Sequence, residues 1–299
     1  MMKTNFPNAI QALRIYGNNL NGTNNHMFRD DIHLSIMPIG GESDNFPEFN
    51  AKFIGEESEN KKASLILEEL AEYSNYHSDT KLLSDVIRNT ARYLSWNGWS
   101  VSEILYDNEN KKIRFSRFTT ERLYKIGKRY IQIPKSNKDY NKKINFLEVD
   151  NIWKIEIPSQ LDGKKGFQQI INKLDKFDSL MPKFFQEDMS QQYNHREYRE
   201  LNFIFNTKTT LKWGWSLRDL DTDSKTEFYL LYQKLQFKWA LAVLREYIIE
   251  ELNKLLQRLE IDSEIIVSGL PSPNEVLEFR KEFLNGKRTF DELLKFIFY

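Results

Sequence analysis

The sequence predicts an α+β fold in which a helix-plus-hairpin unit precedes a series of long helices. Two observations carry this prediction. Apolar side chains recur every three or four positions through residues 224–260, which is the period of a helix with a wide apolar stripe. Apolar and polar residues alternate in residues 101–106, 112–118, 129–134 and 152–158, which is the period of strands with one buried face.

Residues 224–260 are expected to form a single, very long helix. Ser224 and Glu227 have the spacing of a capping box at its start. At about 1.5 Å per residue the helix would be roughly 55 Å long, whereas a typical globular helix has about three or four turns. Such a helix crosses its whole domain or reaches another subunit. Three side chains on its stripe are candidates for core or oligomer contacts: Leu244, Ile248 and Leu252.

Shorter elements with clear end signals follow the long helix. Residues 264–268 are predicted to form a strand. Ser272 and Glu275 form a second capping box, and the helix that they start is expected to end at Gly286. Thr289 is in position to cap a final short helix.

The middle of the chain contains two more predicted helices. One covers residues 82–94 and stops at Gly98, directly before the first alternating segment. The other covers residues 167–177, where apolar side chains again recur at helical spacing.

Two short motifs lie within this order of elements. Residues 96–104 read Trp-Asn-Gly-Trp-Ser-Val-Ser-Glu-Ile and join the predicted helix to the first strand. The second motif is formed by Gly286, Thr289, Asp291 and Glu292 near the C-terminus. With the order of the elements, these motifs resemble the tailed-phage portal protein family over roughly residues 65–299, by element order more than by identity.

The resemblance implies a portal-like architecture with a wing-like unit and long helices around a channel. It implies a structural subunit and no enzyme: a ring of about a dozen copies at a capsid vertex, through which DNA passes during packaging and ejection. The implied partners are other copies of the chain, the capsid protein, the terminase, the head-completion and tail proteins, and double-stranded DNA bound without sequence specificity. It implies no cofactor, no metal and no membrane, and it places the chain in the virion, assembled in the host cytoplasm.

The chain departs from the family pattern in two places. Portal proteins usually carry a long insertion that forms the stem and the clip, whereas only residues 189–213 could serve here, so a reduced clip is expected. The Gly-x-Ser sequence of the family is missing from the predicted helix at residues 167–177. Four segments are expected: an irregular N-terminal arm (1–65), a wing-like α+β unit (66–160), a helical connection (161–215), and the long helix with the C-terminal helices (216–299).

The segment before the long helix is the candidate channel loop, because portal proteins often project a loop towards DNA there. Its candidate DNA-facing residues are Lys212, Arg218, Asp219, Asp221 and Asp223. Trp213 and Trp215 fit either the root of such a loop or aromatic anchors in the core. The three aspartates have the opening spacing of a calcium loop, but residue 224 is serine where that loop needs glycine, so no metal site is predicted.

Charge is unevenly distributed along the chain. Residues 41–79 contain ten acidic and three basic residues, for a net charge of −7. Residues 111–143 contain twelve basic and two acidic residues, for a net charge of +10. The basic-patch candidates are Lys111, Lys112, Arg114, Arg117, Lys125, Lys128 and Arg129. This segment could contact DNA phosphates, face solvent, or meet the acidic region of a neighbouring subunit, and the last two are favoured.

Composition limits the other function classes. The 43 basic and 43 acidic residues cancel, so bulk charge does not indicate a general nucleic-acid binder. The absence of cysteine excludes a disulfide framework and a thiolate metal site. A metal-dependent nuclease or another nucleic-acid-processing enzyme, with carboxylates from distant segments, stays open. So does an oligomeric adaptor of a mobile element that uses the long helix as its stem.

Overall fold

The chain has an α+β fold, as the sequence predicts. The structure is a computed structural model, and it describes residues 24–38, 49–71, 76, 78–107, 112–117, 122–133, 145–186, 195–216 and 227–298. Its helices are α1 (Asn24–Ser35), α2 (Glu57–Glu68), α3 (Asp79–Asn97), α4 (Gly163–Gln186), α5 (His195–Thr209), α6 (Glu227–Arg258), α7 (Pro273–Leu284) and α8 (Phe290–Phe298).

The strands form small antiparallel sheets. They are β1 (Asn50–Gly55), β2 (Trp99–Asp107), β3 (Lys112–Arg117), β4 (Arg122–Ile126), β5 (Arg129–Ile133), β6 (Asn145–Glu148), β7 (Ile152–Glu156) and β8 (Ser263–Ser268). The sheet orders are β1-β8, β3-β2-β7 and β4-β5-β6. The predicted hairpin is confirmed, since β2 pairs with β3 and Ile104 lies opposite Phe115. Strands β4 and β6 were not expected from the sequence.

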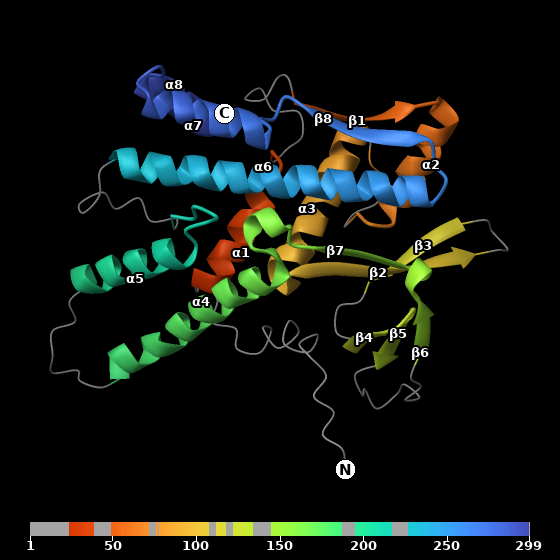
Figure 1. The fold of residues 1–299 in the computed structure, drawn as a ribbon, viewed down its shortest axis with the longest axis horizontal. Helices are drawn as coiled ribbons and strands as arrows, with labels where there is room; N and C mark the ends of the chain where they lie inside the picture. The colour runs from red at the N-terminus through yellow and green to blue at the C-terminus, as the bar shows by residue number, and fades with distance from the viewer. Residues whose placement is uncertain are drawn as a thin grey trace, which may run out of the picture.

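Helix α6 organises the molecule. It runs across most of the width of the molecule in Figure 1, with the β1-β8 ribbon and α7 above it and the β3-β2-β7 sheet below it. It contacts α3, α7, α8, β7 and β8. The predicted long helix is therefore confirmed, while the capping box proposed at Ser224 lies outside the described residues.

The main core forms where α6 meets α1, α3 and α4. Leu244, Ile248 and Leu252 are each 0% exposed within it, so these three candidates are core residues of this chain. Phe28 and Ile32 of α1 are equally buried. The expectation that residues 1–65 form only an irregular arm is therefore wrong for α1 and for β1. Helix α1 has a short apolar face, which gives too weak a periodic signal to be recognised.

Local end signals predicted several helix boundaries correctly. Gly98 ends α3 in the left-handed region, with φ of 72°, as predicted. The start of α3 was not predicted: Ser78 caps it by accepting a hydrogen bond from the Lys81 amide at 3.3 Å, so the helix begins before residue 82. Ser272 and Glu275 form the predicted capping box of α7. Thr289 accepts a hydrogen bond from the Glu292 amide at 3.2 Å and so caps α8.

The segment expected to form a reduced clip is mostly helical. Helix α5 and the turn after it occupy residues 195–213. Helices α4 and α5 lie side by side, because Phe177 and Phe205 stack with their ring centroids 4.3 Å apart. A clip within residues 189–213 would be limited to 189–194, which lie outside the described residues.

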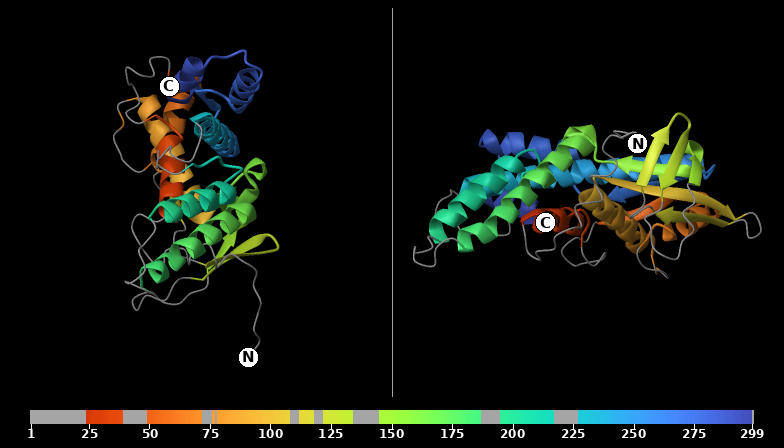
Figure 2. Two further views of the ribbon diagram at one scale, coloured as in Figure 1. Left: turned by 90° about the vertical axis from the view of Figure 1, so that its left-hand side faces the viewer. Right: turned by 90° about the horizontal axis from the view of Figure 1, so that it is seen from below.

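The β4-β5-β6 sheet is attached to the β3-β2-β7 sheet by a small separate cluster. Tyr130 and Leu147 pack there against Trp99, Val101 and Ile152. This sheet lies on the opposite side of α6 from the β1-β8 ribbon, as Figures 1 and 2 both show. Among the helices in the described part of the chain, none has the length and apolar character needed to cross a membrane.

Candidate functional site

Lys212 is the one proposed channel residue within the described part of the chain, since Arg218, Asp219, Asp221 and Asp223 lie outside it. Its Nζ atom lies 2.5 Å from Oδ1 of Asp162, and its carbonyl oxygen accepts a hydrogen bond from Nε2 of Gln236 at 2.8 Å. Both contacts hold Lys212 against the body of the protein. Lys212 is nevertheless exposed, so a position facing DNA stays a prediction for this residue.

The two tryptophans beside Lys212 are core anchors. Trp213 is 0% exposed and Trp215 is 2% exposed. Both rings pack against Phe28 of α1, at centroid distances of 5.7 and 5.3 Å respectively. Their burial joins the turn after α5 to the main core, which agrees with the second of the two readings that the sequence left open.

The basic candidates within the described residues lie on two different sheets. Lys111 lies outside the described residues, and Lys112 and Arg114 belong to β3. Arg117 is half-buried: its guanidinium donates a hydrogen bond to the carbonyl of Leu70 and lies 4.5 Å from the ring centroid of Tyr93. Arg117 therefore holds β3 against the body and is not a free surface charge.

The remaining basic candidates belong to the β4-β5 hairpin. Lys125, Lys128 and Arg129 are exposed there, and Arg129 forms an exposed ion pair with Glu148 at 3.0 Å. The structure thus separates the basic-patch candidates into two groups, on two sheets. Sequence distance alone could not show this, because the separation depends on which strands pair.

The outer face of the β4-β5-β6 sheet carries apolar side chains that the sequence analysis missed. Tyr124, Ile131 and Phe146 are cross-strand partners and form a row on one face, with Ile126 on the same side. Phe146 is 65% exposed and Ile126 is 53% exposed. We call these four residues the apolar sheet face. Arg129, opposite Ile126, lies on the same face and pairs with Glu148, Lys128 lies in the turn beside it, and Lys125 lies on the opposite face with Tyr130.

A second exposed surface lies on the β1-β8 ribbon. Ile54 is 46% exposed and Ile266 is 36% exposed, and cross-strand pairing places Glu264 beside Ile54 on the same face. Lys52 lies opposite Ile266 on the same face. Acidic residues flank the two strands in the sequence, at the start of α2 and just before β8. They are Glu56, Glu57, Glu59 and Asp262. We call Ile54, Glu264, Ile266 and these four acids the acidic ribbon face.

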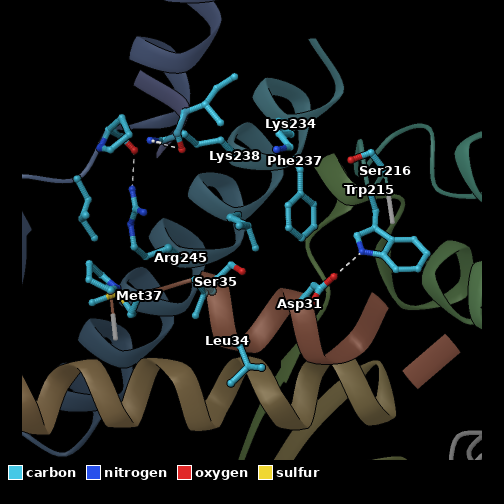
Figure 3. A pocket seen from close by; sticks show the side chains of 16 residues that line it. Asp31, Leu34, Ser35, Met37, Trp215, Ser216, Lys234, Phe237, Lys238 and Arg245 are labelled. Carbon is cyan, nitrogen blue, oxygen red and sulfur yellow. Dashed lines mark hydrogen bonds between the residues drawn. The ribbon is translucent and has the colours of Figure 1, made fainter. Parts of the chain in front are cut away.

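A cavity of about 530 Å³ lies between α1, α6 and the connection from β8 to α7 (Figure 3). Lys234, Lys238 and Arg245 line it from one face of α6. Leu34 and Met37, at the end of α1 and just after it, line the opposite wall. The residues come from distant parts of the sequence, so no local motif could reveal this cavity.

Burial changes the ionisation of two of these cations. It lowers the pKa of Lys238 to about 8, and the nearby positive charge of Arg245 acts in the same direction. Burial also lowers the pKa of Arg245 to about 10, while Glu246 and Glu275 oppose this change. Lys238 donates hydrogen bonds to the carbonyls of Phe296 and Ile297.

The only hydrogen bond that Arg245 makes with described residues is to the carbonyl of Pro271, at 2.5 Å. Within the described ranges, no carboxylate forms an ion pair with Lys238 or Arg245. Lys238 and Arg245 are therefore buried cations whose hydrogen bonds within the described residues go to neutral carbonyls.

No group of histidine, aspartate and glutamate in the described part of the chain has an arrangement that could hold a metal ion. No protein-family model and no curated protein matches this chain.

Proposed function

We propose that this chain is a portal-like structural subunit that forms a closed ring at a phage capsid vertex, through which double-stranded DNA passes. The order of the elements from α3 to α8 supports the proposal, because it follows the order on which the resemblance to portal proteins rests. The terminase, the capsid protein and the head-completion and tail proteins would be its partners. The proposed role requires no catalytic residue.

One observation carries the ring assembly. The apolar sheet face and the acidic ribbon face are both exposed, and the sheets that carry them lie on opposite sides of α6. The bases Lys128 and Arg129 adjoin the first face, whereas acidic residues flank the strands of the second in the sequence. Two different surfaces that fit each other make a head-to-tail contact, and repetition of that contact by rotation closes a ring. Apolar side chains at the centre and complementary charges at the rim are typical of such interfaces.

The first test is the mass and symmetry of the purified protein, measured by mass photometry and negative-stain electron microscopy. We expect a closed ring of about a dozen subunits. A monomer that cleaves DNA in the presence of magnesium would overturn the proposal in favour of a nuclease. A small open oligomer without a central channel would favour an adaptor.

The second test addresses the contact itself. Phe146→Asp puts a charge in the centre of the apolar sheet face and should abolish the ring, while the exposed position leaves the fold intact. Leu284→Asp is the matched control, because Leu284 is 54% exposed on α7, away from both faces. Lys128→Glu should weaken the ring, and Glu264→Lys in the same chain should partly restore it. A ring that is equally stable in all four variants would show that other surfaces form the contact.

A further inference from the structure

We propose that the cavity between α1, α6 and the β8–α7 connection binds an extended acidic segment of a partner protein. This inference concerns a different site from the ring contact and does not depend on ring assembly. It rests on the positions of the three cations and on the apolar walls between them.

The cations form a row along α6. Lys234, Lys238 and Arg245 are separated by four and seven positions, and Leu241 lies between the last two on the same face. At about 1.5 Å per residue, the row is roughly 16 Å long. An extended peptide of about five residues covers that distance, whereas a single small anion reaches at most two of the cations.

The charges of the cavity favour an anionic ligand. Among the described residues that line it, Asp31 is the one with a carboxylate, and Oδ2 of Asp31 accepts a hydrogen bond from Nε1 of Trp215 at 2.8 Å. Lys238 and Arg245 are held by backbone carbonyls. A buried cation is stabilised more by a carboxylate than by a neutral acceptor, so an incoming acidic side chain gains a charge-assisted hydrogen bond.

The walls favour a polypeptide as the carrier of that charge. Leu34, Met37, Leu241 and Leu270 present aliphatic surface to the cavity. Acidic residues that alternate with leucine would place carboxylates against the cations and apolar side chains against these walls. The volume of about 530 Å³ falls in the range of known ligand pockets. A phosphate ion has no apolar body that could use such walls.

The test uses the full chain and calorimetric titration with a synthetic peptide, acetyl-Asp-Leu-Glu-Leu-Asp-amide. Comparison probes are the same peptide with Asn and Gln in place of the acids, sodium acetate, inorganic phosphate, and a short single-stranded oligothymidylate. We expect the acidic peptide to bind at least about tenfold more tightly than each comparison probe, which corresponds to about 1.4 kcal/mol. Tighter or equal binding of phosphate, acetate or the oligonucleotide would overturn the inference, and so would no binding of the acidic peptide.

Two variants locate the site, and a third is the matched control. Lys238→Met removes a cation from the cavity. Ser35→Glu adds a negative charge at an exposed residue of its lining and leaves the contacts of Lys238 and Arg245 intact. Lys254→Met removes a lysine from the same helix outside the cavity, where it pairs with Glu250 and Glu251.

Both cavity variants should weaken peptide binding at least about tenfold, and the control should bind as the wild type does. If Lys238→Met fails to fold, Ser35→Glu alone decides the question. In the wild type, ¹³C NMR of methylated lysines should show a rise in the pKa of Lys238 when the peptide binds, because a bound carboxylate stabilises the ammonium form. Equal peptide binding by wild type and Ser35→Glu would contradict the assigned site.

Discussion

The carboxylate of Asp178 in α4 caps the start of α1, where the backbone N–H of Asn25 donates a hydrogen bond to its Oδ2 at 3.0 Å. The backbone N–H and the side-chain amide of Asn24 donate to Oδ1 at 3.3 and 3.0 Å. A helix normally receives its cap from an adjacent residue, whereas this one receives it from 153 positions away. The contact fixes α1, and with it one wall of the cavity, to α4.

Replacement of Asp178 should loosen this attachment. Asp178→Ala leaves buried N–H groups at the start of α1 without an acceptor, so the free energy of unfolding should fall by about 1–3 kcal/mol. Asp178→Asn keeps one acceptor and should lose less. Urea denaturation measures the change, with Asp175→Ala as the control, because Asp175 is exposed on the same helix. Equal losses of unfolding free energy in Asp178→Ala and Asp175→Ala would show that the hydrogen bonds of Asp178 to α1 do not stabilise the protein.

Gly214 should tolerate no side chain. It has φ of 74°, and an added Cβ would lie 2.6 Å from the backbone nitrogen of Phe237 in α6. Gly214→Ala should therefore cost backbone strain of about 1–2 kcal/mol plus the displacement of α6. Gly286→Ala is the matched control, since Gly286 has φ of 70° with nothing within 4 Å of an added Cβ. Both variants carry the backbone strain, so the difference between their melting temperatures measures the cost of the contact between the added Cβ at position 214 and α6. Similar melting temperatures would contradict such a contact.

Leu244 should be a major contributor to stability. It is 0% exposed, so Leu244→Ala should lower the free energy of unfolding by about 2–5 kcal/mol. Leu244→Asp buries an unpaired charge and should prevent folding or oligomer formation. Leu284→Ala, at an exposed position, should change stability by less than about 0.5 kcal/mol. A folded Leu244→Asp protein with an unchanged oligomer would mean that α6 is not the core helix described here.

Stability should rise with pH in the alkaline range because of Lys238. Its pKa is about 8 in the folded protein, against an ordinary value of 10.5. Between these values the unfolded chain binds a proton that the folded protein does not, so the free energy of unfolding increases with pH, by at most about 1.4 kcal/mol per unit. Lys234, whose pKa burial also lowers, acts in the same direction.

Chemical denaturation at pH 8, 9 and 10 measures the effect. The difference in unfolding free energy between wild type and Lys238→Met should shift in favour of wild type as pH rises. The pKa of Arg245 is about 10 in the folded state, so its effect on the unfolding free energy falls mainly above pH 10. Arg245 therefore changes the measurement between pH 8 and 10 little. A difference that stays constant from pH 8 to 10 would show that Lys238 is not destabilised by burial.

DNA binding by the isolated protein should be weak, independent of sequence and sensitive to salt. A channel through which DNA slides makes few lasting phosphate contacts, and few contacts give a shallow dependence of affinity on salt. Fluorescence anisotropy with two unrelated duplexes at several salt concentrations tests this. Removal of Lys212 and Arg218 together should hinder DNA packaging and leave ring assembly intact. Tight binding to one sequence would indicate a regulatory or enzymatic role instead.

The sequence by itself determined the elements whose signals are local. Helices α7 and α8 were predictable because a cap and its partner lie within a few residues of each other. Helix α3 was predictable from its apolar spacing and from the glycine at its end. Helix α6 was predictable because its apolar stripe repeats over many turns, and the hairpin of β2 and β3 because alternating segments flank a short turn. The assignment of Leu244, Ile248 and Leu252 to the core follows from that same stripe.

Tertiary structure decided the features that depend on contacts between distant residues. Strand β1 exists because it pairs with β8, with Ala51 opposite Val267, and α1 is held by Asp178. Strand pairing divided the basic segment between two sheets and created the apolar sheet face. The cavity formed because α6 brings Lys238 and Arg245 beside α1 and the β8–α7 connection. Such contacts gain their energy only after the whole chain has folded, so no local pattern in the sequence encodes them.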